Sequence, residues 1–300
     1  MPLCATGRFV AGRMNANEAT LVWVDEYSRM AEAYDRNIAP RFEPIAQEVV
    51  RLAAPQPNEL FLDVGTGTGL LACLLSPFVR PQGVVAIDLA DNAISVASYR
   101  AGNAGIRNIR WEMLDSRNIV YRGKLFDGVV SNLGIPDLGH DRTFQEVHRV
   151  TKPGGRFVFS EWPSDFPPAF SIPRRLIAAH ATASPSQDLA RIREARQLIR
   201  SDPEAQGLGD PAFVRKALAK ADFDRVEVST KTFPVSFRDL DDFLAFTESQ
   251  GWCERELREM TPEVRQAFQA DLATELEKFR TTGDGIETRW TLHFYRAERD

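Results

Sequence analysis

Three glycines at every second position follow a short apolar run in the first quarter of the chain. The segment reads Leu62-Asp63-Val64-Gly65-Thr66-Gly67-Thr68-Gly69 and continues into the apolar Leu70-Leu71-Ala72. Glycine allows tight turns and leaves the backbone uncovered, so that a ligand can approach it closely. The pattern predicts a strand, a tight turn and a helix, with the turn beside a flat or charged ligand.

The spacing of these glycines separates two kinds of ligand. In the dinucleotide fingerprint G-x-G-x-x-G, the third glycine would fall at position 70, where this chain has Leu70. Here the third glycine is Gly69. Asp63, just before the turn, is poorly suited to an anionic diphosphate but well suited to a cation such as the amino group of a methionine moiety. A pyrophosphate cofactor is therefore disfavoured.

Two further carboxylates end the next two predicted strands. Asp88 follows Val84-Val85-Ala86-Ile87, where it could accept both hydroxyls of a ribose, and Asp115 ends the strand after that. Parallel strands end at the same edge of a sheet. Asp63, Asp88 and Asp115 therefore predict a binding line for a sulfonium nucleoside along that edge.

The elements that must position these residues alternate between strands and helices. Helical spacing covers residues 18–35 and 41–54 ahead of the first strand. The alternation that follows predicts a parallel sheet wound by helices. The predicted strands span 59–64, 83–88, 109–114, 126–131, 156–161, 225–233 and, by apolar alternation, 286–294.

The βα rhythm is interrupted twice, which divides the chain into segments. Prolines cluster between Pro163 and Pro173, and a second interruption is expected to hold two helices, opened by Ser236-x-x-Asp239 and by Thr261-Pro262. The predicted division is an N-terminal helical lid at 1–55, a Rossmann-like core at 56–162, a first helical cap at 163–210, continued core at 211–233, a second cap at 234–284 and a last core strand at 285–300.

Composition limits the partners and the compartment. The 300 residues carry a net charge of −5, which argues against binding nucleic acid, because that binding needs clustered Lys and Arg. Three distant cysteines, Cys4, Cys73 and Cys253, read as thiols in a reducing compartment. Residues 1–17 lack the apolar core of a secretion signal, and no apolar run approaches the length of about 18 residues that spans a membrane. We expect a cytoplasmic protein without stable membrane insertion.

Taken together, these motifs resemble the class I S-adenosylmethionine-dependent methyltransferases, in the branch typified by ubiquinone and menaquinone biosynthesis enzymes. The resemblance implies an α/β fold with a Rossmann-like, seven-stranded, mostly parallel sheet in the order 3-2-1-4-5-7-6, with N-terminal helices and helical cap insertions. The matching segments are 62–69, 88–89, 115–116, 126–132 and 146–155.

The resemblance also implies a cofactor, S-adenosyl-L-methionine, with S-adenosyl-L-homocysteine as product, and no metal. By this resemblance the glycine turn would hold the methionine portion of the cofactor. Asp88 would bind the ribose and Asp115 the adenine, and the end of the fourth strand would lie beside the methyl group. One departure is Ile119-Val120-Tyr121, which replaces the family's Leu-Pro pair. The implied cofactor-binding residues are Tyr34, Asp63, Gly65, Thr66, Gly67, Gly69, Asp88, Leu89, Asp115, Ser116, Asn132 and Leu133.

Methyl transfer from a sulfonium is an in-line displacement, so alignment and exclusion of water can supply much of the acceleration. No covalent nucleophile is required, and no catalytic residue is assigned. A base helps if the acceptor is a hydroxyl or an acidic carbon. His140, after the fourth strand, and Glu161, at the end of the fifth, are the substrate-pocket candidates. A surface histidine beside Asp141 and a solvent-facing carboxylate are the structural alternatives.

The apolar spacing of the caps predicts a chamber for a small, largely apolar acceptor, methylated on O, C or N. Enzymes that methylate exocyclic base amines usually have Pro-Pro and an aromatic residue after the fourth strand, whereas this chain has Ser131-Asn132-Leu133-Gly134. Two alternatives stay open: a cyclisation or rearrangement in the same chamber, and a cofactor-binding interaction protein without catalysis. A homodimer also stays open.

Overall fold

The computed structural model describes residues 14–281 and 283–300. Cys4 and most of residues 1–17, for which the sequence predicts no secretion signal, lie outside the described residues. The strands are β1 Phe61–Val64, β2 Val84–Asp88, β3 Ile109–Met113, β4 Phe126–Asn132, β5 Thr151–Glu161, β6 Arg225–Phe237 and β7 Ile286–Glu298. The helices are α1 Ala16–Asn37, α2 Ala39–Ala53, α3 Leu70–Leu75, α4 Asp91–Asn103, α5 His140–Val150, α6 Pro168–Ala179, α7 Gln187–Ser201, α8 Pro203–Gly207, α9 Pro211–Lys220, α10 Leu240–Glu248, α11 Gly251–Arg258 and α12 Pro262–Leu276, with short 3-10 helices at Ser76–Val79 and Glu277–Phe279.

The seven strands form one sheet in the order β3-β2-β1-β4-β5-β7-β6, which confirms the predicted fold class. The five strands from β3 to β5 pair in parallel, and β7 is antiparallel to both of its neighbours. Because β1, β2 and β4 run in the same direction, Val64, Asp88 and Asn132 end at one edge of the sheet. This carboxyl edge is where the sequence places its candidate ligand.

Several limits in the second half of the chain differ from the prediction. β5 begins at Thr151 instead of 156, β7 continues to Glu298 instead of 294, and the second cap holds three helices, α10, α11 and α12, where two were expected. β6 continues to Phe237, past the predicted end at 233, although Pro234 cannot donate a backbone hydrogen bond. The strand tolerates this proline because β6 is the edge strand of the sheet. Ser236 therefore lies in β6, and Asp239 itself caps α10 by accepting a hydrogen bond from the backbone of Asp242.

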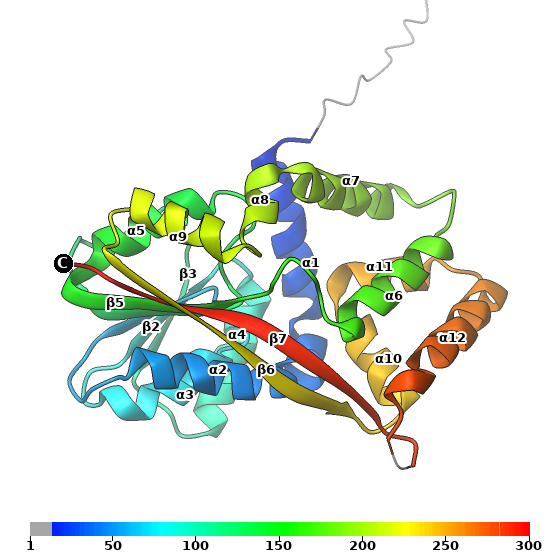
Figure 1. Ribbon diagram of the computed structural model, residues 1–300, viewed down its shortest axis with the longest axis horizontal. Coiled ribbons are helices and arrows are strands. Elements are labelled where there is room, and N and C mark those ends of the chain that lie inside the picture. Colours follow the sequence, from blue (N-terminus) through cyan, green and yellow to red (C-terminus); the bar gives the residue numbers. More distant parts are fainter. Residues whose placement is uncertain (1–13, 282) are drawn as a thin grey trace, which may run out of the picture.

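Helices cover both faces of the sheet and extend beyond its carboxyl edge. Figure 1 shows α2 and α3 below the sheet and α5 and α9 above it. On the right of the same view, α6, α10, α11 and α12 form a helical cap, and α1 lies between the sheet and this cap. The carboxyl edge is therefore covered rather than open to solvent.

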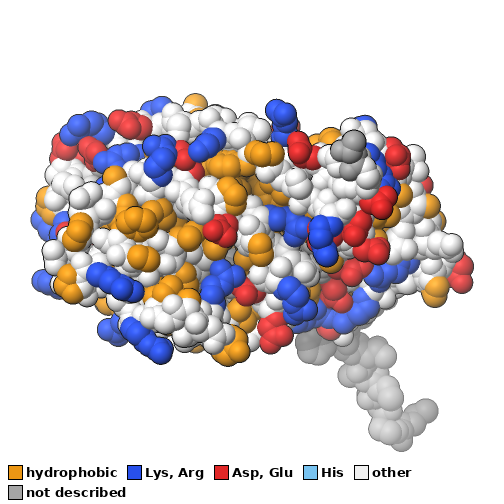
Figure 2. Space-filling model, turned by 90° about the horizontal axis from the view of Figure 1, so that it is seen from below, with side chains coloured by type: hydrophobic (Ala, Val, Ile, Leu, Met, Phe, Trp, Pro, Cys, Tyr) orange, Lys and Arg blue, Asp and Glu red, His pale blue; other side chains and the backbone are white. Residues whose placement is uncertain are grey.

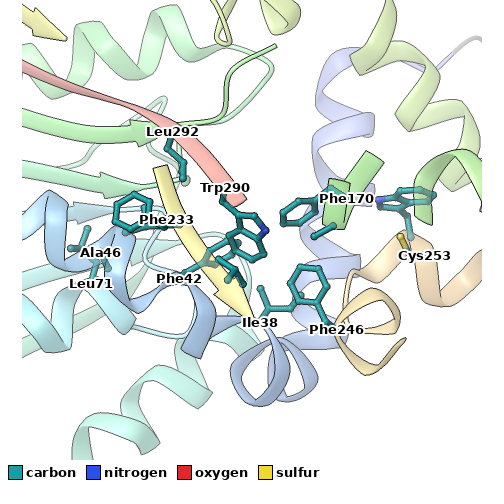
Figure 3. Close-up of a cluster of buried hydrophobic side chains, with 14 of the residues drawn as sticks. Ile38, Phe42, Ala46, Leu71, Phe170, Phe233, Phe246, Cys253, Trp290 and Leu292 are labelled. Atoms are coloured by element: carbon teal, nitrogen blue, oxygen red, sulfur yellow. The ribbon is translucent and has the colours of Figure 1, made fainter. Parts of the chain in front are cut away.

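An aromatic cluster joins the cap to the sheet (Figure 3). Trp290 of β7 is fully buried, and its ring lies 5.5 Å from Phe42 of α2, 5.2 Å from Phe170 of α6 and 5.7 Å from Phe246 of α10, between ring centroids. Burying a side chain of this size contributes about 1.5–3 kcal/mol. The cap therefore shares a hydrophobic core with the sheet and holds a defined position over its edge.

Polar contacts fix α1 across the carboxyl edge. Ser28 donates a hydrogen bond to Asp91, and Arg100 of α4 forms an ion pair with Asp35. At the other side, Arg255 of α11 pairs with the buried carboxylate of Glu26 at 3.0 Å. These contacts hold α1 between α4 of the sheet domain and α11 of the cap.

Basic and acidic side chains are interspersed over the face shown in Figure 2. Cys253 is buried and Cys73 is half-buried, and both are free thiols. Throughout residues 14–281 and 283–300, every helix is too short or too polar to cross a lipid bilayer.

Candidate functional site

The first glycine of the turn is required by a close approach between two loops. Gly65 has a φ of +65°, and a Cβ there would lie 2.4 Å from the carbonyl oxygen of Gly134. A Cβ on Gly134 would in turn lie 2.6 Å from the carbonyl oxygen of Gly65. The loops after β1 and β4 therefore touch through bare backbone, which brings the glycine turn against Asn132 and Leu133.

The other two glycines of the turn have different surroundings. Gly67 has a φ of +52°, and a Cβ there would meet no atom within 4 Å, so open space adjoins the turn at this point. Gly69 has a φ of +81°, and its Cβ would lie 2.7 Å from Trp111 and 2.8 Å from Ala97. Gly67 therefore leaves room for a ligand, whereas Gly69 permits the packing of the turn against β3 and α4.

Asp63 is a fully buried carboxylate with one unpartnered oxygen. Its Oδ2 accepts a hydrogen bond of 2.6 Å from the hydroxyl of Thr66, whereas its Oδ1 makes no hydrogen bond of ordinary length with the described residues. The backbone N–H of Ala72 lies close enough to lower the pKa of Asp63, but burial outweighs it and raises this pKa to about 7. A buried acceptor without a full hydrogen bond is costly, and an ammonium group would satisfy it. The contact between Asp63 and the amino group of a methionine moiety stays a prediction.

Asp88 is oriented by the turn that it faces. Its Oδ2 accepts from the backbone N–H of Gly67 at 2.8 Å, and its Oδ1 accepts from that of Ala90 at 2.9 Å. Each carboxylate oxygen can accept more than one hydrogen bond, so capacity remains for ribose hydroxyls. Leu89 lies between these contacts, half-buried. The ribose contact itself stays a prediction.

Asp115 and Ser116 already have protein partners. Arg117 holds both oxygens of the Asp115 carboxylate, with its Nη2 2.8 Å from Oδ2, and keeps the pKa of Asp115 below its usual range against the opposing effect of burial. The hydroxyl of Ser116 lies 3.0 Å from that of Thr143. Adenine binding by this pair stays a prediction, and Arg117 is a neighbour that the sequence did not indicate.

Two tyrosines of α1 face the carboxyl edge, of which the sequence indicated only Tyr34. Tyr34 packs against Phe42, with ring centroids 6.2 Å apart, and burial and the nearby charges of Tyr27 and Asp88 raise its pKa. Tyr27 is 54% exposed, yet its surroundings raise its pKa to about 12, first through desolvation and then through Asp137. The spacing of seven residues, which places both side chains on one helix face, could have revealed Tyr27.

Tyr27, Asp137, Glu161 and Arg174 lie near one another beside the carboxyl edge, since the charges of these groups act on one another's pKa values. We infer a hollow between these side chains, because Tyr27 and Asp137 keep accessible surface although protein surrounds them. Asp137 is likewise exposed, and burial raises its pKa to about 6. Glu161 is half-buried, and desolvation followed by the charge of Asp137 raises its pKa to about 8. Polar groups with shifted pKa values in a hollow are typical of a functional site.

His140 lies in a packed environment. Its side chain is 1% exposed, and its ring centroid lies 5.8 Å from that of Phe144 and 5.7 Å from that of Phe213. Its Nδ1 is 3.2 Å from the carbonyl oxygen of Asp137. These contacts favour a structural role in positioning the loop that carries Asp137. The placement of His140 in the substrate pocket stays a prediction.

The end of β4 carries backbone strain beside the predicted methyl position. Asn132 accepts a hydrogen bond of 2.8 Å from the hydroxyl of Ser160, which ties the two central strands together. Leu133, the next residue, has a φ of +59°, a conformation that costs a non-glycine residue about 1–2 kcal/mol. Such strain often occurs where a functional loop needs a fixed shape.

This strain leads to a prediction for Leu133→Gly. Lost burial of the half-buried side chain offsets the relief of about 1 kcal/mol, so we expect a melting temperature within a few degrees of the unmodified protein. Methyl transfer should fall about tenfold because the loop loses its fixed shape. Lys124→Gly is the control, since Lys124 is exposed, has a φ of +58° and precedes β4 at the opposite edge. Equal activity in the two variants would contradict the prediction.

A comparison with known families decides what this arrangement is. Residues 61–155, from β1 through the start of β5, match a model described as a methyltransferase domain. This range contains the glycine turn and the carboxylates at the ends of β1 and β2. Residues 61–155 therefore form a methyltransferase domain of the class I, S-adenosylmethionine-dependent kind. Its cofactor is S-adenosylmethionine.

Curated relatives of the chain include methyltransferases named for menaquinone and ubiquinone. It is 29% identical over 142 residues to the demethylmenaquinone methyltransferase of Symbiobacterium thermophilum, covering 45% of this chain and 57% of the relative. It is 32% identical over 145 residues to the malonyl-acyl-carrier-protein O-methyltransferase of a Marinomonas species, covering 43% and 53%. The methyltransferase thus spans about half the length of these two relatives. A third, the ubiquinone/menaquinone C-methyltransferase of Pseudomonas putida, is 27% identical over 193 residues, covering 61% and 72%.

Solved structures share the fold of this methyltransferase. The YcgJ protein of Bacillus subtilis superposes with a TM-score of 0.52 at 16% identity, covering 85% of this chain and 98% of that one. The 4+2 cyclase SpnF superposes with a TM-score of 0.50 at 17% identity, covering 86% and 80%. Identities this low show the fold and no more. Within residues 14–281 and 283–300 of the methyltransferase, no group of three or more His, Cys, Asp or Glu side chains is arranged to hold a metal ion.

Proposed function

We propose that this chain transfers the methyl group of S-adenosylmethionine to a small organic molecule held in the hollow beside the carboxyl edge. The observation that supports this most directly is the unpartnered, buried Oδ1 of Asp63 near open space at Gly67. A ligand whose ammonium group pairs with Asp63 and whose neighbouring atoms approach the backbone of Gly67 fits both observations. The proposal concerns the whole protein, whereas the family match covers its core.

In this proposal the chain's own residues bind, orient and exclude water. Asp63 pairs with the ammonium group, Asp88 holds the ribose, and Tyr34 covers the cofactor from α1. The bound cofactor supplies an electrophilic methyl group for in-line transfer. The cap and α1 keep bulk water out, which strengthens each of these electrostatic contacts.

Glu161 is the residue that we propose as proton acceptor when the methylated atom is a hydroxyl oxygen or an acidic carbon. It ends β5 beside the hollow, and its Oε1 accepts a hydrogen bond of 2.8 Å from the backbone N–H of Trp162, which fixes the carboxylate. With its pKa raised to about 8 by burial, Glu161 gives up and takes a proton near neutral pH. An amine acceptor would need only its neutral form and no base.

The hollow favours a small, largely apolar acceptor over a macromolecule. Trp162 and Phe170 lie 5.1 Å apart between ring centroids, beside the end of β5. α1 lies across the carboxyl edge and is fixed by ion pairs at Glu26, near its middle, and at Asp35, near its C-terminal end. A compact organic molecule fits such a covered site, whereas a protein or nucleic acid does not reach into it.

Cyclisation or rearrangement of a bound substrate is the second candidate, because the fold of SpnF, a cyclase, is shared across most of the chain. The fold alone does not separate the two reactions. Their products do, since methyl transfer adds the mass of one methylene and cyclisation adds none.

The test combines binding with product detection. Calorimetric titration of the purified chain with S-adenosylmethionine and S-adenosylhomocysteine should show one site with a dissociation constant in the micromolar range, corresponding to about −8 kcal/mol. Incubation with small-molecule extracts and the cofactor should then give products heavier by one methylene. Absence of binding refutes both candidates, and binding with only isomeric products refutes methyl transfer.

A further inference from the structure

Arg174 is a charged side chain of the first cap that has no counterion. It lies on α6, and no hydrogen bond or ion pair joins its guanidinium to any described residue, while its Nε is buried and unpartnered. Its neighbour Arg175 forms an ordinary ion pair with Glu275 at 2.9 Å. A half-buried guanidinium whose Nε is buried without a partner is unusual, because its desolvation is not offset by a hydrogen bond or an ion pair.

Aromatic rings hold this guanidinium in place. Its central carbon lies 4.4 Å from the centroid of Phe166, 5.7 Å from that of Phe170 and 5.9 Å from that of Trp252. Stacking on ring faces stabilises a cation while leaving the N–H groups at its edge uncommitted. Arg174 is therefore positioned but not neutralised.

Arg174 lies beside the carboxyl end of β5, where we place the acceptor. Its guanidinium carbon is 5.7 Å from the ring centroid of Phe170, and that ring lies 5.1 Å from Trp162, the residue that follows Glu161 at the end of β5. Arg174 in turn lowers the pKa of Asp137, although the two side chains lie beyond ion-pair distance. Carboxylates therefore lie at the sheet edge, where we place the cationic cofactor. The guanidinium of Arg174, which has no ion-pair partner among the described residues, lies on the cap side.

A second arginine, Arg196, adds positive charge near Arg174. Arg196 of α7 also stacks on Trp252, with 3.3 Å between its central carbon and the ring centroid. Among the described residues its acidic neighbour is Glu256, which lies 3.8 Å away and also pairs with Arg193 at 2.6 Å. Two guanidinium groups therefore contact Trp252, and the second shares its carboxylate with Arg193.

We propose that Arg174 binds an anionic oxygen group, a carboxylate, on the methyl acceptor. The inference rests on the proposed function, because it concerns the substrate of the same hollow. An acceptor with an aromatic or aliphatic body and one carboxylate would pack its body against the half-buried Trp162 and place its charge at Arg174. This arrangement narrows the acceptor from a neutral apolar molecule to an organic acid.

The test compares an acid with its uncharged counterpart. We use the full chain saturated with S-adenosylhomocysteine and titrate it by calorimetry with 2-naphthoate and with 2-naphthamide, which differ in charge at one group. The unmodified protein should bind the acid at least tenfold more tightly, as expected for charge-assisted hydrogen bonds. Arg174→Met should reduce that ratio to about one, and Arg174→Lys should retain part of it.

Arg175→Met is the matched control, since Arg175 is the next residue, is exposed and has its own carboxylate partner. It should keep the full preference for the acid. Equal affinity of the unmodified protein for the two compounds, no binding of 2-naphthoate at millimolar concentration, or an unchanged ratio in Arg174→Met overturns the inference.

The same titrations without S-adenosylhomocysteine distinguish failure of the proposed methyl transfer from failure of carboxylate binding by Arg174. If the protein prefers 2-naphthoate but does not bind the cofactor, only the proposed function is refuted. If it binds the cofactor but does not prefer 2-naphthoate, only the inference about Arg174 is refuted.

Discussion

Gly67→Ala is expected to weaken S-adenosylmethionine binding about 100-fold, or roughly 2.7 kcal/mol, while the protein remains folded. The space beside Gly67 is open, so the added methyl group meets no protein atom within 4 Å. The methyl group instead occupies the room that a ligand needs to approach the backbone. The φ of +52° adds a folding cost of about 1–2 kcal/mol for alanine, which a chain of this size survives.

Gly105→Ala isolates the binding effect from the folding cost. Gly105 has a φ of +70°, an equally empty Cβ position and an exposed site in the turn after α4, away from the carboxyl edge. We expect both variants to lose a similar few degrees in melting temperature and only Gly67→Ala to lose calorimetric affinity. If both bind the cofactor equally well, the turn does not contact it.

The glycine turn and the strand order could be predicted because their signals are local. The turn from Gly65 to Gly69 stands between an apolar strand and an apolar helix, and each later strand ends in turn residues. Once the first four strands are parallel, the carboxylates at Asp63 and Asp88 must share one edge. Only the outer limits shifted, as at Pro234, which the edge position of β6 permits.

The wall of the hollow could not be predicted because it is built from long-range contacts. Tyr27, Asp137 and Arg174 come from α1, from the loop after β4 and from α6, which no sequence periodicity connects. In the sequence, Arg174 stands beside Arg175 in a proline-rich segment, and only the structure shows that one has a carboxylate partner and the other does not. The acceptor prediction changed for this reason, from an apolar molecule to an organic acid.

The buried carboxylate of Asp63 lowers the free energy of unfolding when it is ionised. Its pKa rises from about 4 in the unfolded chain to about 7 in the folded protein. Between these values the folded state binds a proton that the unfolded state has released, so stability falls as pH rises through this window and stays lower above it. Asp63→Asn should therefore fold at least as stably as the unmodified protein above pH 7, as a thermal melt at pH 8 would show.

The same substitution is expected to remove most of the cofactor affinity. At pH 8 the carboxylate is ionised and can pair with the ammonium group, so replacing it should cost about 3 kcal/mol, or more than 100-fold in affinity. Below pH 7 the unmodified protein must first lose a proton from Asp63, so its affinity should fall towards tenfold per unit of pH. Asp63→Asn has no such proton to lose.

Titrations between pH 5.5 and 8 with both proteins separate Asp63 from other groups that change charge in this range. Asp137, whose pKa is about 6, is present in both proteins and contributes equally to both curves. The difference between the curves therefore belongs to Asp63. Parallel curves, or an unchanged affinity at pH 8, would contradict a direct ion pair and move the ammonium group elsewhere along the edge. A difference that grows from pH 6 to pH 8 ties the stability cost of this buried carboxylate to the ligand that it binds.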